Sequence, residues 1–279
     1  MFQNNPPSAI WKKWADWYKL LTEYAIPSPK EIDLQRQYIK KHTSPDKEFK
    51  VLVLGSTPRL RDLLSEFQNC KVFLCDINPE MTFAMTELLK RANPENETWV
   101  KASWLDMPLR DDEFDFVLGD FTYDNVPFEF HEQFMSEVHR VLKKDGVYLG
   151  RYFLFLDSHK PVDFKKVYHE IGEITNDKLS TLWGIATFFT VEPLTRIVKV
   201  QDFVDHCKTL DIDFLEKSKE LSGADEYYPF DKLWYSYNLK DFEKLVQSKF
   251  RIEESHYTDD NRMIEGYEDA FTVKALIKI

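Results

Sequence analysis

Residues 49–81 decide the fold, because they hold the apolar run Val51-Leu52-Val53-Leu54, the turn Gly55-Ser56-Thr57-Pro58 and a second run, Val72-Phe73-Leu74-Cys75-Asp76. An amphipathic stretch, residues 60–67, lies between the two runs. The pattern predicts a strand, a tight turn, a helix and a second strand that ends in an acid. Glycine lets a ligand approach the backbone, and a carboxylate ending the second strand can accept hydrogen bonds from both ribose hydroxyls. The stretch is typical of a fold that binds a nucleoside.

The same alternation of strands and helices continues along the chain. Short apolar runs without polar alternation are typical of strands buried on both faces of a parallel sheet. We expect further strands at 98–102, 114–120, 146–155, 250–257 and 271–279, and helices at 80–91, 129–142 and 239–248. The last two strands are expected to pair antiparallel. The predicted class is α/β: a Rossmann-like, doubly wound, seven-stranded, mostly parallel sheet with an antiparallel C-terminal strand.

Helical segments precede and interrupt this core. Aromatic residues recur at helical spacing between Trp11 and Leu21, and a second helix is expected at 31–42. Charged helices are expected at 163–174, 178–189 and 200–210, in a stretch too polar to hold a large core alone. We therefore divide the chain into an N-terminal helical lid (1–48), a nucleoside-binding core (49–156), a helical cap insertion (157–238) and a completion of the sheet (239–279).

Composition narrows the class of protein. The 279 residues are 43% hydrophobic, enough for one large domain, and the net charge of −11 disfavours a nucleic-acid partner. No signal-peptide pattern or membrane-length apolar run is found, so we expect a cytoplasmic protein without a membrane partner. Three cysteines without CxxC pairing and seven histidines without ligand spacing predict no metal site.

Four local sequences, in this order and spacing, resemble the class I S-adenosylmethionine-dependent methyltransferases. They are the glycine turn at 51–58, the segment Leu74-Cys-Asp-Ile-Asn-Pro-Glu-Met81, the loop and strand at 102–108 and 114–120, and the helix-turn-strand at 141–149. The resemblance implies S-adenosylmethionine as cofactor, S-adenosylhomocysteine as product and a small-molecule methyl acceptor. The cofactor-binding residues that it implies are Gly55, Ser56, Thr57, Pro58, Asp76, Ile77, Met81, Ser103, Trp104, Leu105, Asp120 and Phe121, with Trp14 and Tyr18 from the lid.

The chain departs from the family pattern at two places. Only Gly55 remains where relatives have two or three glycines, and Thr57-Pro58 stiffens the turn. Ser103 stands where many relatives place an aspartate that accepts a hydrogen bond from the adenine amino group. Either the Ser103 hydroxyl or Asp106 is expected to take that role.

Three of these residues also have a structural interpretation. Asp76 would cap the helix that begins near Pro79, but an acid 21 residues beyond Gly55 is where a ribose carboxylate is expected, and we favour that role. Trp104 fits a core position as well as an adenine contact. Asp120, at the carboxyl end of a strand, is expected to contact the cofactor amino group or the acceptor.

Methyl transfer from a sulfonium is an in-line displacement, and it needs a general base only for a protonated acceptor. The candidates are Asp120, Tyr123, Asp124 and His131, with His131 expected as a surface residue at a helix end. The acceptor atom, O, N, C or S, is left open, as is the oligomeric state. Two alternatives are a non-catalytic protein that binds the cofactor or its product, and an NAD(P)-dependent oxidoreductase, against which the missing GxGxxG counts.

Overall fold

The structure is a computed structural model that describes residues 26–157, 162–170, 172–173, 182, 197–222, 233–235, 237–257 and 271–279. The aromatic helix predicted around Trp14 and Tyr18 lies outside the described residues, as does most of the helix predicted at 178–189.

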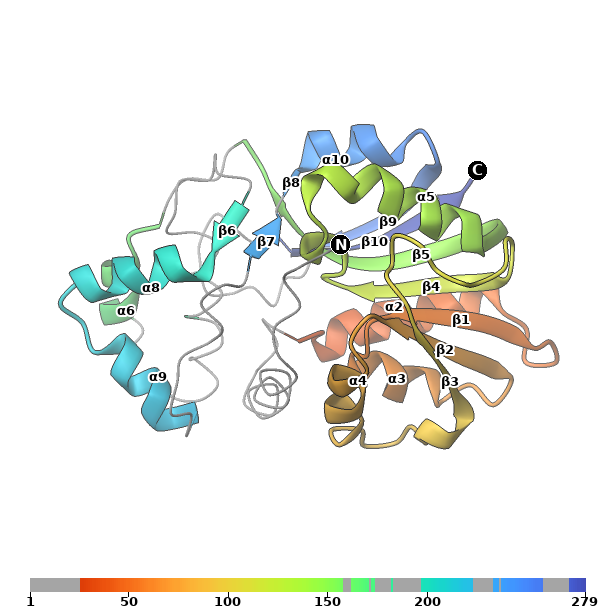
Figure 1. The fold of residues 1–279 in the computed structure, drawn as a ribbon, viewed down its shortest axis with the longest axis horizontal. Helices are drawn as coiled ribbons and strands as arrows, with labels where there is room; N and C mark the ends of the chain where they lie inside the picture. Colours follow the sequence, from red (N-terminus) through yellow and green to blue (C-terminus); the bar gives the residue numbers. More distant parts are fainter. Residues whose placement is uncertain are drawn as a thin grey trace.

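A twisted sheet forms the centre of the molecule, with the strand order β3-β2-β1-β4-β5-β10-β9 (Figure 1). Its strands are β1 (Phe49–Leu54), β2 (Cys70–Asp76), β3 (Glu97–Lys101), β4 (Phe114–Asp120), β5 (Leu142–Phe155), β9 (Phe250–Tyr257) and β10 (Phe271–Lys278). β10 is antiparallel to both of its neighbours, and the other pairings along this path are parallel. A short eighth strand, β8 (Tyr237–Asn238), joins the end of β5. The predicted fold class is confirmed.

The strand order reverses between β1 and β4. From β1 the chain moves outward to β2 and β3, then returns to place β4 on the other side of β1. The carboxyl ends of β1 and β4 therefore flank a switch point, where open α/β sheets bind ligands. Gly55 follows β1 and Asp120 ends β4, so both predicted residues lie at this point.

Helices cover both faces of the sheet (Figure 1). Helices α2 (Pro29–His42) and α3 (Pro58–Leu64) pack on one face, and α5 (His131–Val141) and α10 (Leu239–Val246) pack on the other. The helix α4 (Pro79–Thr86) follows β2. A capping box between Ser28 and Glu31 begins α2, so two N–H groups at this helix end are satisfied locally.

The insertion holds a small core that its polar composition did not predict. Helices α6 (Phe164–Glu170), α8 (Val200–Thr209) and α9 (Phe214–Ser222) lie to one side of the sheet (Figure 1). Phe164, Phe203 and Phe214 are fully buried, with ring centroids 5.2 to 6.0 Å apart. Two further strands, β6 (Ile197–Lys199) and β7 (Leu233–Tyr235), form an antiparallel pair that we did not predict. In the part of the chain that the structure describes, no helix is both long and apolar enough to cross a bilayer.

Candidate functional site

The turn after β1 brings three predicted residues together. Gly55 has a φ of +92°, in the region that favours glycine, and its N–H donates to the Cys75 carbonyl at 2.8 Å. A Cβ atom on Gly55 would lie 3.7 Å from Cζ2 of Trp104 and 4.0 Å from Oδ2 of Asp76. The glycine therefore leaves an open backbone surface between an indole ring and a carboxylate.

Asp76 ends β2 and orients the chain that follows. Its Oδ1 accepts a hydrogen bond from the Asn78 N–H at 2.8 Å. The cap of α4 is Asn78, whose Oδ1 accepts from the N–H groups of Glu80 and Met81. Asp76 is thus not the helix cap that the structural interpretation of the sequence allowed. Its carboxylate lies beside the glycine turn, and its ribose contact stays a prediction.

The loop after β3 carries the residues expected at the adenine edge. The Ser103 hydroxyl accepts from the Leu105 N–H at 3.2 Å, while the side chain of Asp106 is exposed. Leu105 is buried, whereas Ile77, directly after Asp76, is 42% exposed. Ile77 therefore presents an exposed apolar side chain directly after Asp76. The choice between Ser103 and Asp106 as the adenine contact stays a prediction.

The indole ring of Trp104 is held by one hydrogen bond and by packing against the core. Its Nε1–H donates to the Cys75 carbonyl at 2.7 Å, and the ring lies 6.4 Å from that of Phe134 in the core. The indole therefore packs against the core and also forms one wall beside Gly55. The core position expected for Trp104 agrees with this packing, and its adenine contact stays a prediction.

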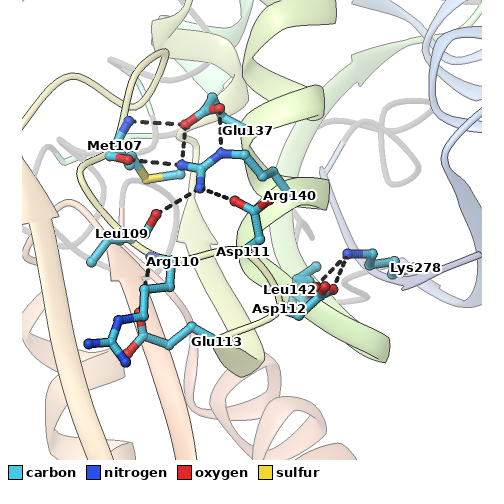
Figure 2. A network of polar contacts seen from close by, with 10 residues as sticks. All are labelled: Met107, Leu109, Arg110, Asp111, Asp112, Glu113, Glu137, Arg140, Leu142 and Lys278. Atoms are coloured by element: carbon cyan, nitrogen blue, oxygen red, sulfur yellow. Dashed lines mark hydrogen bonds and ion pairs between the residues drawn. The ribbon is translucent and has the colours of Figure 1, made fainter.

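A polar network holds the loop 102–113 against α5 (Figure 2). The Arg140 guanidinium donates to the carbonyls of Met107 and Leu109 at 2.8 and 2.7 Å, and it pairs with Glu137 and Asp111. Glu137 also accepts from the Met107 N–H at 3.0 Å, and the hydrogen bonds from Arg140 lower the pKa of this carboxyl. Nearby, Lys278 binds Asp112 and the Leu142 carbonyl. These contacts fix the loop that carries Ser103 to Leu105, and sequence reasoning missed them.

Asp120 lies where it was predicted, but with a buried cation as its partner. Its Oδ1 accepts from Nε of Arg151 at 2.7 Å, and its Oδ2 accepts from the Thr57 hydroxyl at 3.3 Å. The side chains of Arg151 and Asp120 are only 1% and 6% exposed. We missed Arg151 because its only signal in the sequence is a single charge within an apolar run, Val147-Tyr-Leu-Gly-Arg-Tyr-Phe153.

Phe121, the next residue, has a strained backbone. Its φ is +51°, a left-handed value that is rare for a bulky side chain and costs of order 1–3 kcal/mol. The ring lies 4.0 Å from the Arg151 guanidinium, a cation–π geometry, and 6.3 Å from the ring of Trp234 on β7. Such strain persists where surrounding contacts fix a residue, and it often marks a functional site.

Tyr123 and His131 are buried in an aromatic cluster. Their rings stack with centroids 4.0 Å apart, and Nε2 of His131 donates to the Tyr123 carbonyl at 3.0 Å. Burial lowers the pKa of His131 to about 4 and raises that of Tyr123 far above its ordinary value. The expectation that His131 lies on the surface is wrong, because its side chain packs under η3 (Phe128–Phe130) and β8. Both groups are held neutral, so neither suits a general base at neutral pH.

Asp124 is also buried, at 1% exposure. Burial raises the pKa of this carboxyl well above its ordinary value, and this effect outweighs the charge of Arg151 nearby. Burial therefore disfavours the ionised form of Asp124, the form that could accept a proton. Among the residues that the structure describes, no group of three His, Cys, Asp or Glu side chains is placed to hold a metal.

Comparison with known proteins identifies the core. Residues 51–146, from β1 to the first part of β5, match the family model described as a methyltransferase domain. The core is a class I S-adenosylmethionine-dependent methyltransferase domain. The family predicted from the four local sequences is confirmed, and the strand order of this methyltransferase domain agrees with it.

Solved structures share the fold of this methyltransferase domain. A putative Zn-dependent alcohol dehydrogenase from Rhodobacter sphaeroides superposes with a TM-score of 0.60 at 14% identity, over 99% of this chain and 100% of that one. A protein from Pyrococcus horikoshii gives 0.54 at 16% identity, over 95% and 99%. A putative S-adenosylmethionine-dependent methyltransferase from Listeria monocytogenes gives 0.52 at 12% identity, over 96% and 98%. At these identities the likeness shows the fold alone, and it carries no dehydrogenase activity to this chain.

Proposed function

We propose that this protein transfers a methyl group from S-adenosylmethionine to a small-molecule acceptor. The observation that carries the proposal is the carboxylate of Asp76 beside the open glycine turn at Gly55. A ribose at this point would place its two hydroxyls on the carboxylate. The turn at Gly55 to Pro58 would face the methionine part of the cofactor, which has no diphosphate and needs no glycine-rich cradle.

The remaining predicted residues have places in this arrangement. Ile77 and the loop 103–105 would hold the adenine between them, and Met81 lies half-buried on the first turn of α4. The ion-paired carboxylate of Asp120, with Phe121, would meet the cofactor ammonium group. The division into a lid (1–48), a core (49–156), a cap (157–238) and a sheet completion (239–279) is part of the proposal, as are ring contacts from Trp14 and Tyr18.

The mechanism relies on alignment and exclusion of water. Displacement at the methyl carbon disperses the sulfonium charge, and holding acceptor, methyl and sulfur in line can supply several kcal/mol through effective molarity. Tyr123, Asp124 and His131 are buried, and burial disfavours the charged form of each side chain. Asp120 is bound to Arg151. We therefore infer that the nucleophilic atom of the acceptor already has a free lone pair. None of these four residues would then need to remove a proton from it.

Aromatic side chains beside β4 support a small, flat or cationic acceptor. Trp234 and Tyr235 on β7 are half-buried, and their rings lie 6.3 Å from Phe121 and 5.4 Å from Phe128. Rings of this kind bind flat or cationic groups well where water is partly excluded. The net charge of −11 also disfavours a nucleic-acid acceptor.

Calorimetry with S-adenosylhomocysteine tests the cofactor assignment. We expect binding to the wild type and no response to NAD, because no glycine-rich diphosphate loop is present. Asp76→Ala should weaken binding by on the order of a hundredfold, since two charge-assisted hydrogen bonds are lost. Asp46→Ala, an exposed aspartate before β1, is the control and should bind normally. Equal affinity in both variants would refute the ribose assignment.

Methyl transfer separates an enzyme from an inert binder. The protein is incubated with S-adenosylmethionine labelled in the methyl group and a cell extract divided by ultrafiltration into small and large molecules. We expect label in the small-molecule fraction, abolished by Asp76→Ala. Label only in macromolecules would overturn the acceptor class, and no label in either fraction would favour a non-catalytic binder.

A further inference from the structure

One guanidinium joins three separate parts of the chain at the carboxyl edge of the sheet. Arg151 on β5 donates to Asp120 on β4 and lies 3.5 Å from Oε2 of Glu31 in the first turn of α2. It also donates to the Ile26 carbonyl at 3.4 Å. Its other face carries the ring of Phe121. The N-terminal segment, the end of β4 and β5 therefore meet at a single cation.

Two buried carboxylates share this guanidinium. The side chains of Arg151 and Glu31 are 1% and 2% exposed, and that of Asp120 is 6% exposed. Water screens such buried charges little, so the guanidinium couples the position of the Asp120 carboxylate to that of Glu31.

Glu31 is itself fixed by the capping box of α2. Its Oε2 accepts from the Ser28 N–H at 2.7 Å, and its own N–H donates to the Ser28 hydroxyl at 3.1 Å. Thr57, in the glycine turn, donates to the opposite oxygen of Asp120. The carboxylate of Asp120 is thus fixed at both oxygens, by Thr57 in the turn after β1 and by Arg151, which also pairs with Glu31 on α2.

We propose that Arg151 is a positioning residue for the cofactor and that Glu31 supports it. Arg151 orients the Asp120 carboxylate towards the ammonium group of the cofactor, and Glu31, fixed by Ser28, holds the Arg151 guanidinium in place. The helix α2 thereby contributes to cofactor binding without touching the ligand. The inference rests on the proposed function and names residues that the family pattern does not include.

A second buried ion pair provides a matched control. Arg61 on α3 donates to both carboxylate oxygens of Glu97 at 2.9 and 2.7 Å, and the two side chains are 0% and 4% exposed. Glu97 begins β3, four residues before Lys101, which is paired with Asp76. At about 3.3 Å per residue the control pair lies roughly 13 Å from the carboxyl edge. Breaking it removes a buried charge of the same kind away from the site.

The test measures the Kd for S-adenosylhomocysteine in Arg151→Lys, Glu31→Gln and Glu97→Gln. Lysine keeps the charge of Arg151 but cannot bind Asp120 and Glu31 in the same planar geometry. We expect Arg151→Lys to raise the Kd about tenfold, the size of one charge-assisted hydrogen bond, and Glu31→Gln to raise it several-fold. Glu97→Gln should lower the melting temperature and leave the Kd within about twofold of wild type.

A double-mutant cycle distinguishes positioning from a general loss of structure. In the Asp120→Asn background, Arg151→Lys should change the Kd by less than about twofold, because the carboxylate that it orients is gone. A tenfold change that persists in this background would overturn the proposal. The proposal would also be overturned if Arg151→Lys and Glu31→Gln both bound with a Kd within about twofold of wild type, as expected for Glu97→Gln. In either case binding by the wild type would still support the proposed function. The proposed function itself fails only if the wild type does not bind S-adenosylhomocysteine.

Discussion

Gly55→Ala separates the cost to folding from the cost to binding. At a φ of +92° an alanine is strained by about 1–2 kcal/mol, and the protein should lose that much stability. The new methyl group meets Trp104 and Asp76 at 3.7 and 4.0 Å, which are ordinary contacts, so no clash adds to this cost. The variant should therefore fold with a modestly lower free energy of unfolding.

Binding should suffer more than folding in this variant. The methyl group occupies the surface between the indole and the carboxylate, where the proposed ligand lies against the backbone. Displacing a ligand from a close-packed surface by one methyl group costs about 1–3 kcal/mol, so the Kd should rise by roughly tenfold to a hundredfold. Urea unfolding of the free protein and calorimetry with S-adenosylhomocysteine measure the two effects separately.

Gly172→Ala is the matched control for backbone strain. Gly172 has a φ of +71°, and a Cβ there would meet no atom of the described residues within 4 Å. This variant should lose similar stability and bind the ligand as the wild type does. If Gly55→Ala and Gly172→Ala bind with the same affinity, the reasoning that places the ligand against Gly55 is refuted.

Three further predictions concern the surroundings of the site. Arg140→Met leaves the Met107 and Leu109 carbonyls without their donor, so the free energy of unfolding should fall by about 2–4 kcal/mol and ligand binding should weaken, measured by urea unfolding and calorimetry. Unchanged binding would show that the loop does not need this anchor. Burial lowers the pKa of His131 from 6.5 to about 4, so between these pH values only the unfolded chain takes up the proton. The wild type should lose up to about 3 kcal/mol of stability as pH falls through this window, and His131→Phe should lose less; parallel pH profiles would contradict this. Because burial raises the pKa of Asp124 well above 3.8, folding opposes ionisation of this carboxyl, and the cost to stability grows as pH rises above 3.8. Asp124→Asn should therefore be more stable than the wild type at pH 7, and this difference should shrink as pH falls towards 3.8. Thermal unfolding of both proteins across this pH range measures the difference. A variant less stable than the wild type at pH 7 would show that the carboxyl is ionised in the folded protein.

Features that depend on neighbouring residues were predictable from the sequence. The strands at 114–120 and 250–257 were predicted with the bounds that the structure has, because each is an apolar or alternating run between polar turns. The mostly parallel sheet with an antiparallel C-terminal strand was also predicted, from the βα alternation and the turn-linked last two strands, whereas the order of the strands was not. The helix predicted at 80–91 ends at Thr86 instead, because no local signal marks the end of that apolar pattern.

Features that depend on distant partners were not predictable. Arg151 binds Glu31, which is 120 positions earlier in the chain, and no local pattern connects the two. His131 was expected on the surface because it begins a helix, but Tyr123 and Tyr237 pack against its ring from other segments. Asp120 was placed correctly at the end of β4, while the cation that neutralises it was missed. Tertiary contacts decided these three environments.

A crystal structure of the wild type grown with S-adenosylhomocysteine tests the central claim most directly. The account predicts both ribose hydroxyls on the carboxylate of Asp76 and the homocysteine chain across the turn at Gly55. Density for the ligand elsewhere, or a sugar that does not touch Asp76, would contradict it.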